Sequence, residues 1–173
     1  LTLDHCTDGS VIAEELAKEG YPAFVGPSLG GKSKVELINK AFSTPADLAN
    51  AGVNVSIITD APVIPLQHLP MCAGLAANAG LGYEAAWRAI TINPARALDI
   101  ADRVGSLEVG KDADIAMFTA NPVEFDSRNI MTIIDGKIVK EDIELEKFLV
   151  EPDEAIKLME EKGEIYKVEL IKE

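Results

Sequence analysis

The chain has 173 residues, of which 47% are hydrophobic, and its formal net charge at pH 7 is −13. This length suits one domain of ordinary size, or one and part of another, and the apolar content is sufficient for a sizeable core. The acidic balance argues against nucleic acid as a partner, because phosphate backbones are bound by Lys and Arg. No stretch approaches the roughly 18 consecutive apolar residues of a membrane-spanning helix, so the sequence predicts no membrane partner.

The first residues, LTLDHCTDG, lack the basic start and apolar core of a secretory signal. The sequence therefore predicts a cytoplasmic protein. Cys6 and Cys72 stand far apart without a CxxC motif, which predicts neither a disulfide framework nor a zinc–thiolate site. Both cysteines are expected to be small buried hydrophobic residues.

Short apolar runs alternate with helical patterns up to about residue 103. Strand–helix–strand order predicts parallel strands joined by right-handed crossovers. In the last of these helices, Asn93 is expected as the N-cap and Pro94 in the first turn. The expected elements, in chain order, are a strand at LTLDH (1–5), a helix at 10–20, a strand at PAFVGPS (22–28), helical turns within 29–52, a strand at VNVSIITD (53–60), and helices at 69–80, 82–92 and 93–100.

From Val104 onward the pattern changes to short alternating runs, VGSLEVGKDADIAMF and IMTIIDGKIVK, broken by GKDAD and DG. These are signals of antiparallel hairpins. We therefore divide the chain into an α/β unit (1–103), a small antiparallel β unit (104–140) and an acidic tail (141–173). The tail has 12 acidic and 5 basic side chains, a net charge of −7, and its apolar spacing favours a solvated helix and a short strand over an interaction tail.

Two of the predicted strands end on a functional side chain. His5 closes the first strand and Asp60 closes the third, and parallel α/β proteins place their chemistry at the carboxyl ends of strands. Imidazole and carboxylate can together ligate a divalent metal, and a carboxylate beside an activated water can accept its proton. A catalytic zinc site usually has three protein ligands, so the spacing alone leaves open that His5 is a core or surface histidine and Asp60 a turn former or helix cap.

Several longer motifs resemble those of a known family. The run AWRAITINPARALDIADRVGSLEVGKDADIAMF, with IDGKIV, is similar to the carboxyl-terminal signature of the amidohydrolase superfamily. LTLDHCTDG, VGPSLGGKSKVEL and ITDAPVIPLQHLPMCAGLA resemble its imidazolonepropionase-like and prolidase-like members. The resemblance covers residues 1 to about 140.

The resemblance implies a fold and a mechanism. The fold is α/β: a partial (β/α)8 barrel, about strands six to eight, followed by part of a small antiparallel β-sandwich. The implied function is hydrolysis of a non-peptide or dipeptide-like carbon–nitrogen bond, in a small amide or cyclic amide, by metal-activated water. His5 and Asp60 would bind a divalent metal, with zinc the expected ion, and Asp60 would also be the general base.

The family's other metal ligands would precede Leu1, so we expect this chain to be a carboxyl-terminal part of an amidohydrolase and to be inactive alone. Its open sheet edges would need the missing barrel half or self-association. One alternative is a non-catalytic remnant or binding module. Another is a phosphate or nucleotide site, because GPSLGGKS (26–33) meets the pattern GxxxxGK[ST]. His68 follows Asp60 by eight residues and is expected to have a capping or surface role.

Overall fold

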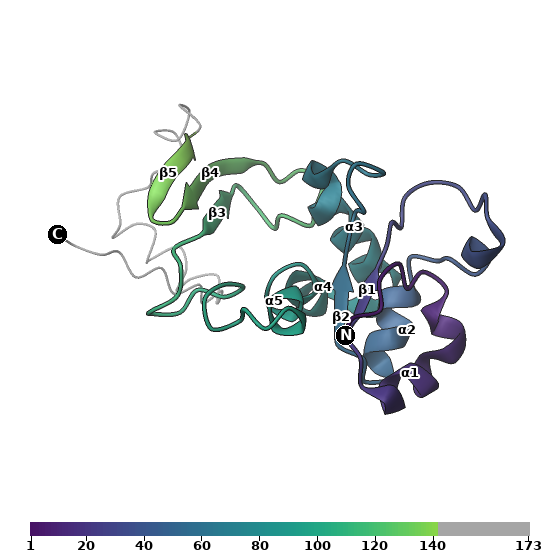
Figure 1. Ribbon diagram of the computed structural model, residues 1–173. Coiled ribbons are helices and arrows are strands. Elements are labelled where there is room, and N and C mark those ends of the chain that lie inside the picture. The colour runs from purple at the N-terminus through teal and green to yellow at the C-terminus, as the bar shows by residue number, and fades with distance from the viewer. Residues whose placement is uncertain (142–173) are drawn as a thin grey trace, which may run out of the picture.

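The computed structural model describes residues 1–141, so the acidic tail expected at 141–173 lies, beyond Glu141, outside the described residues. Figure 1 shows an α/β part at the N-terminal side and a separate small antiparallel sheet at the other side. In the described range all helices precede residue 103 and all antiparallel strands follow it. The division of the chain into domains near that residue stays a prediction.

The described elements follow the expected order with shorter strands. The α-helices are α1 (Ala13–Glu19), α2 (Thr44–Asn50), α3 (Leu69–Ala76), α4 (Tyr83–Ala89) and α5 (Ile92–Ala97). The strands are β1 (Ala23–Val25), β2 (Val55–Ile57), β3 (Ile115–Phe118), β4 (Asn129–Ile134) and β5 (Lys137–Glu141). Short 3-10 helices are η1 (Gly9–Ile12), η2 (Val35–Leu37) and η3 (Leu66–His68), and a π-helical turn, η4 (Ala77–Leu81), follows α3.

The first sheet is parallel and centred on β1. β2 pairs with β1 in parallel, with Ala23 opposite Val55. On the other edge of β1, the strand expected at 1–5 is reduced to one parallel bridge between Leu3 and Ala23. That bridge is supported by two backbone hydrogen bonds, in which Leu3 N–H donates to Pro22 O and Phe24 N–H donates to Leu3 O (2.9 and 2.8 Å). Three parallel segments therefore lie in the order first segment, β1, β2.

The helix ends agree only partly with the sequence analysis. Gly20 ends α1 in the left-handed conformation (φ 74°) and its N–H donates to Leu16 O. A glycine at this position predicts such a helix end. The N-cap expected at Asn93 is wrong, because α5 begins at Ile92. The Asn93 side chain instead donates to Val55 O on β2 at 2.9 Å. A tertiary hydrogen bond to the strand has replaced the local capping bond.

The second sheet is antiparallel, in the order β3–β4–β5. The DG signal is confirmed, because Asp135 and Gly136 join β4 to β5 and both have positive φ (50° and 73°), as a two-residue hairpin turn requires. Residues 104–110 form no strand; they are bends, turns and irregular backbone.

Helix α3 joins the two parts of the fold. Its small residues Cys72, Ala73 and Ala76 are buried in a cluster with Val123, from the connection between β3 and β4. A Cβ atom at Gly74 would lie 2.1 Å from the carbonyl oxygen of Val123, so only glycine permits this approach. The small-residue pattern of α3 is therefore explained by close contact with the loop before the second sheet.

This contact gives a stability prediction for Gly74→Ala. Alanine favours a helix over glycine by about 1 kcal/mol, but the clash with Val123 should dominate and destabilise the fold by about 1–3 kcal/mol. Thermal denaturation followed by circular dichroism measures the effect. Gly31→Ala is the control, because nothing lies within 4 Å of its Cβ position. A Gly74→Ala protein at least as stable as the parent would contradict the close approach.

Candidate functional site

His5 and Asp60 are positioned by the two neighbours of β1. The segment carrying His5 is held by Cys6 N–H, which donates to Phe24 O at 3.0 Å. The segment carrying Asp60 is held by Ile58 N–H, which donates to Val25 O at 3.0 Å. Because both segments run parallel to β1, their carboxyl ends lie at the same end of the sheet.

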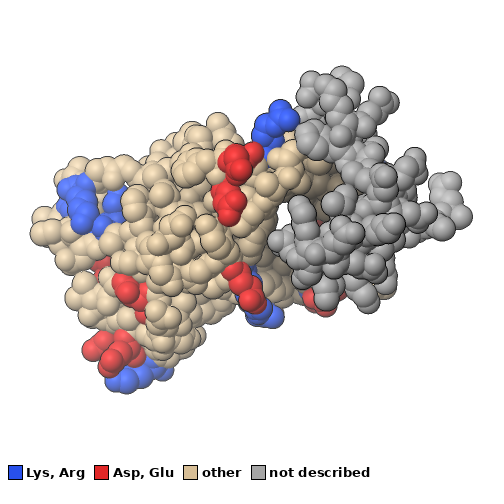
Figure 2. Space-filling view, turned by 180° about the vertical axis from the view of Figure 1, so that it is seen from behind, with Lys and Arg blue, Asp and Glu red and all other residues tan. Residues whose placement is uncertain are grey.

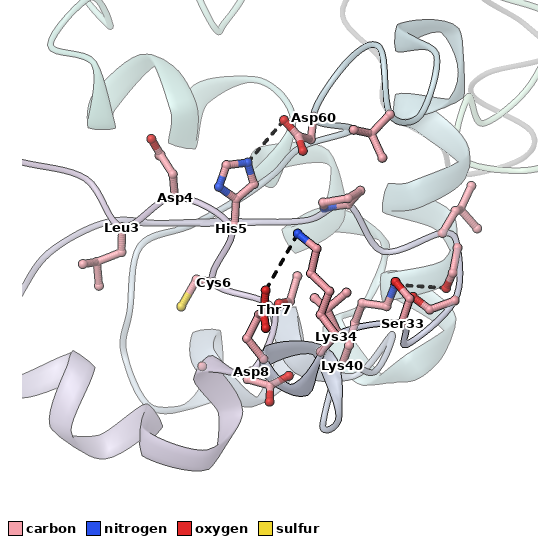
Figure 3. A pocket seen from close by; sticks show the side chains of 18 of the residues that line it. Leu3, Asp4, His5, Cys6, Thr7, Asp8, Ser33, Lys34, Lys40 and Asp60 are labelled. Carbon is pink, nitrogen blue, oxygen red and sulfur yellow. Dashed lines mark hydrogen bonds and ion pairs between the residues drawn. The ribbon is translucent and has the colours of Figure 1, made fainter.

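The two side chains are in contact. His5 Nε2 lies 3.2 Å from Asp60 Oδ1, and the side chains are 57% and 37% exposed. Figure 3 shows the imidazole and the carboxylate turned toward each other at the mouth of the pocket. Both residues also have left-handed backbone conformations, with φ of 54° and 53°. Such values are uncommon outside glycine and gather at functional sites, which adds a backbone reason to treat the pair as a candidate site.

The turn-forming alternative for Asp60 explains its backbone but not its side chain. Val63 N–H donates to the Asp60 carbonyl at 2.8 Å, so Asp60 does begin a turn. Its carboxylate, however, faces His5. His68 is the N-cap residue of α3 and makes no side-chain cap hydrogen bond, and it does not line the pocket beside His5. The site roles assigned to His5 and Asp60 stay predictions.

The pair lies on the wall of a pocket of about 970 Å³. Its walls come from the first segment and η1, from the loop between β1 and α2, and from the turn that follows β2. Figure 3 shows Asp8, Ser33, Lys34 and Lys40 around the same pocket. The volume is large enough for a small organic molecule.

The loop over residues 26–41 is fastened to the first segment by side chains. Asp8 Oδ2 accepts hydrogen bonds from the Asn39 N–H and from Asn39 Nδ2, at 3.3 and 3.1 Å. At the far end of the loop, Thr44 Oγ1 donates to Thr7 O at 3.2 Å. These contacts hold the loop in place, so that it forms one wall of the pocket.

Lys40 is a pocket residue that the sequence analysis missed. It is only 8% exposed, and its Nζ donates to Gly30 O at 3.0 Å and to Gly31 O at 3.5 Å. Nothing in the sequence INKAF distinguishes this lysine from a solvated one, because its burial depends on Gly30 and Gly31, which precede it by ten and nine residues.

The geometry of GPSLGGKS does not suit a phosphate loop. Such loops end at a helix N-terminus, whereas this one leads into the three-residue η2. Lys32 Nζ donates to Ile38 O at 2.9 Å. Gly26 has a packing role instead, because a Cβ there would lie 2.1 Å from Ile58 O.

The donor set fits part of a divalent-metal site. Zinc bonds of about 2.1 Å at a tetrahedral angle set two ligand atoms roughly 3.4 Å apart, close to the 3.2 Å between His5 Nε2 and Asp60 Oδ1. Imidazole nitrogen and carboxylate oxygen are both ligands that zinc accepts. Among residues 1–141 no group of three or more His, Cys, Asp or Glu side chains could hold a metal, so this part of the chain offers the pair alone.

Burial is the largest cause of the pKa shifts of the two thiols. It raises the pKa of Cys6, against a smaller lowering by a hydrogen bond from the Gly9 backbone. It also raises the pKa of Cys72, which is 1% exposed. Cys72 is buried, as expected, whereas Cys6 is only half-buried.

Comparison with known proteins identifies a family. The model of the "Amidohydrolase family" matches residues 6–139. An imidazolonepropionase from Brevibacillus brevis is 34% identical over 119 residues, covering 64% of this chain and 28% of its own length. The crystal structure of an amidohydrolase from Thermotoga maritima superposes with a TM-score of 0.78 at 35% identity, covering 82% of this chain and 37% of that one.

A second similarity covers a short stretch of the chain and involves a protein of a different class. A threonine–tRNA ligase from Carboxydothermus hydrogenoformans is 68% identical over 37 residues, which is 21% of this chain and 6% of the ligase. This chain spans less than a third of the length of either curated relative. In the part of the chain that the structure describes, no helix has the length and apolarity to cross a membrane.

The raised thiol pKa values predict slow alkylation of the native protein. Because the thiolate is the reacting form, iodoacetamide should label Cys6 and Cys72 slowly at pH 7.5, and labelling should accelerate as the pH rises toward the raised pKa values. Cys6 should react before Cys72, which is the more buried. Mass spectrometry of each cysteine peptide measures the rates, with the urea-unfolded protein as the control. Equal native and unfolded rates would contradict the prediction.

Proposed function

The chain belongs to the amidohydrolase family, and from this premise we propose that His5 and Asp60 are two ligands of a catalytic divalent metal, with zinc the expected ion. The observation that carries the proposal is the 3.2 Å contact between His5 Nε2 and Asp60 Oδ1 at the carboxyl ends of two parallel segments. The proposed reaction is hydrolysis of a carbon–nitrogen bond in a small amide or cyclic amide.

The ion and the two residues have separate tasks. When bound, a divalent ion lowers the pKa of a coordinated water and polarises the scissile carbonyl. His5 contributes a neutral nitrogen ligand, and its exposed ring leaves the site open to solvent and substrate. Asp60 Oδ1 faces His5, which leaves the second carboxylate oxygen to accept the proton of the attacking water.

The proton balance is completed by Asp60. As the water oxygen forms its bond to the carbonyl carbon, the proton passes to the carboxylate. Asp60 then returns that proton to the nitrogen as the carbon–nitrogen bond breaks. The left-handed backbone at Asp60 (φ 53°) fixes the carboxylate at the strand end, and such fixed placement reduces the entropic part of the barrier.

The remaining metal ligands must come from outside residues 1–141, because these residues supply no third donor beside the pair. We therefore assign hydrolysis to the whole protein. In this proposal the present chain contributes a partial (β/α)8 barrel and part of a β-sandwich. A non-catalytic binding module remains the competing function, and the two differ in whether metal-dependent turnover exists.

Surface composition supports association with further protein. Figure 2 shows charged side chains in separate groups on a face that is otherwise uncharged. Large apolar side chains are widely exposed in the described part of the chain, for example Val35, Ile38, Leu66, Leu107, Val109 and Phe125. Apolar exposure on this scale supports an additional covering surface, from the rest of the barrel or from a second copy. Both cysteines are free thiols, which supports a cytoplasmic setting.

The general-base role predicts the effect of Asp60→Asn. In the whole protein, this change preserves the side-chain size but removes the proton acceptor, so turnover of its amide substrate should fall by roughly 10²–10⁴-fold. Asp99→Asn is the matched control, because Asp99 has the same left-handed backbone (φ 59°) and does not line the pocket. Turnover that survives Asp60→Asn would reject the general-base role.

The ligand role predicts the effect of His5→Ala on metal binding. Titration calorimetry of the whole protein with zinc should show an affinity loss of at least about tenfold, because one of the few ligands is removed. His68→Ala removes the other histidine of the chain and should leave the affinity within about twofold. Equal losses for the two variants would exclude a specific role for His5.

A further inference from the structure

Thr44 is a fully buried residue whose hydroxyl binds a distant part of the chain. It is the first residue of α2 and is 0% exposed. Its Oγ1 donates to Thr7 O at 3.2 Å, across 37 residues of sequence. A hydroxyl at a helix start commonly binds backbone groups of its own helix. This hydroxyl instead binds a carbonyl of the segment that carries His5.

Thr7 is joined to His5 by a tight turn. Thr7 N–H donates to His5 O at 2.6 Å, and Cys6 N–H, between them, donates to Phe24 O on β1 at 3.0 Å. Figure 3 shows the chain bending at this turn, with the imidazole of His5 directed toward Asp60. The φ of His5 is 54°. This left-handed conformation is unfavourable for a residue with a side chain and persists only where surrounding contacts enforce it.

The bond from Thr44 is the contact that holds the carbonyl end of this turn. The Cys6 bond fixes the turn to the sheet, and the Thr7 N–H bond closes it. The Thr7 carbonyl points to a different element and is held there by Thr44. Because Thr7 is only 4% exposed, a carbonyl that lost Thr44 would be poorly solvated, and the peptide would turn to find another donor. Such a turn of the peptide would also move the backbone at His5.

We propose that Thr44 is a positioning residue for the candidate site: through the Thr7 carbonyl it holds the turn at His5, and thereby holds the imidazole against Asp60. Thr44 is not among the described residues that line the pocket, so it acts only through the turn. The geometry of metal ligands commonly depends on such contacts beyond the ligands themselves. The consequence for metal binding rests on the proposed function, but the effect on the contact between His5 and Asp60 does not.

A purely stabilising role for Thr44 makes a different prediction. If its hydroxyl only fastened α2 to the first segment, its removal would lower the melting temperature and leave His5 unchanged in the folded protein. Gly74→Ala is the control for stability alone, because its clash with Val123 weakens the fold at a position that does not line the pocket. The two roles can therefore be separated by observing His5 itself.

The test compares Thr44→Val with Thr44→Ser in the whole protein. Valine has nearly the shape of threonine but cannot donate, whereas serine keeps the hydroxyl. With isotope-labelled histidine, NMR at one fixed pH and without added metal observes the ring nitrogens, and His5→Ala assigns the signals of His5. Thr44→Val should move the Nε2 signal of His5 toward its position in Asp60→Ala, where the contact is lost. Thr44→Ser should keep the parental signal, and His68 should be unchanged in both.

Zinc titration calorimetry gives a second measurement. The affinity should fall roughly tenfold in Thr44→Val, while Thr44→Ser and Gly74→Ala should stay within about twofold of the parent. Thr44→Ala, which is smaller and also lacks a donor, is the second variant, and melting temperatures verify that each protein is folded.

Parental His5 signals in a folded Thr44→Val or Thr44→Ala protein would overturn the proposal, and so would the same change in Thr44→Ser. A parent that binds no zinc, with the shift of His5 still present in Thr44→Val, would reject the proposed function and leave the positioning role standing.

Discussion

The pairing of two chain segments with β1 is the constraint on which the site depends. The first segment and β2 lie on opposite edges of β1 and run in the same direction, so the residues that follow them meet at one end. These pairings are short, with three residues in each strand and a single bridge at Leu3. A slip of one residue on either edge would reverse the side chains of that segment and separate His5 from Asp60.

The loop after β1 depends on the same alignment. Gly26 approaches Ile58 so closely that no Cβ could fit, and this fixes where the loop leaves the sheet. Asp8 then holds Asn39, and Lys40 holds the glycines at the loop's other side. The loop wall of the pocket is thus held by contacts with the segments that carry His5 and Asp60, which couples the position of Lys40 to the position of these two residues.

The sequence was sufficient for the type and order of most elements because these depend on local patterns. The exceptions are the strand expected at 1–5, which is a single bridge, and residues 104–110, which form no strand. The helix end at Gly20 and the hairpin at Asp135 and Gly136 follow from backbone preferences of single residues. The comparison with the Thermotoga amidohydrolase structure supports a barrel-related fold, in keeping with the resemblance. The cap at Asn93 and the burial of Lys40 were not predictable, since each depends on a partner distant in sequence, Val55 for the first and the Gly30–Gly31 turn for the second.

The position of Asp60, an acidic residue just beyond the buried strand β2, is explained by its surroundings. All three residues of β2 are buried, so the strand itself must be apolar or small. Asp60 lies beyond this buried region, where its side chain is 37% exposed, and the cost of desolvating a carboxylate is largely avoided. A turn alone would be satisfied by many polar residues. The Asp60 carboxylate also contacts the imidazole of His5, which belongs to a segment on the other edge of β1. Only an acidic side chain meets this second requirement, and metal ligation and proton transfer would impose it.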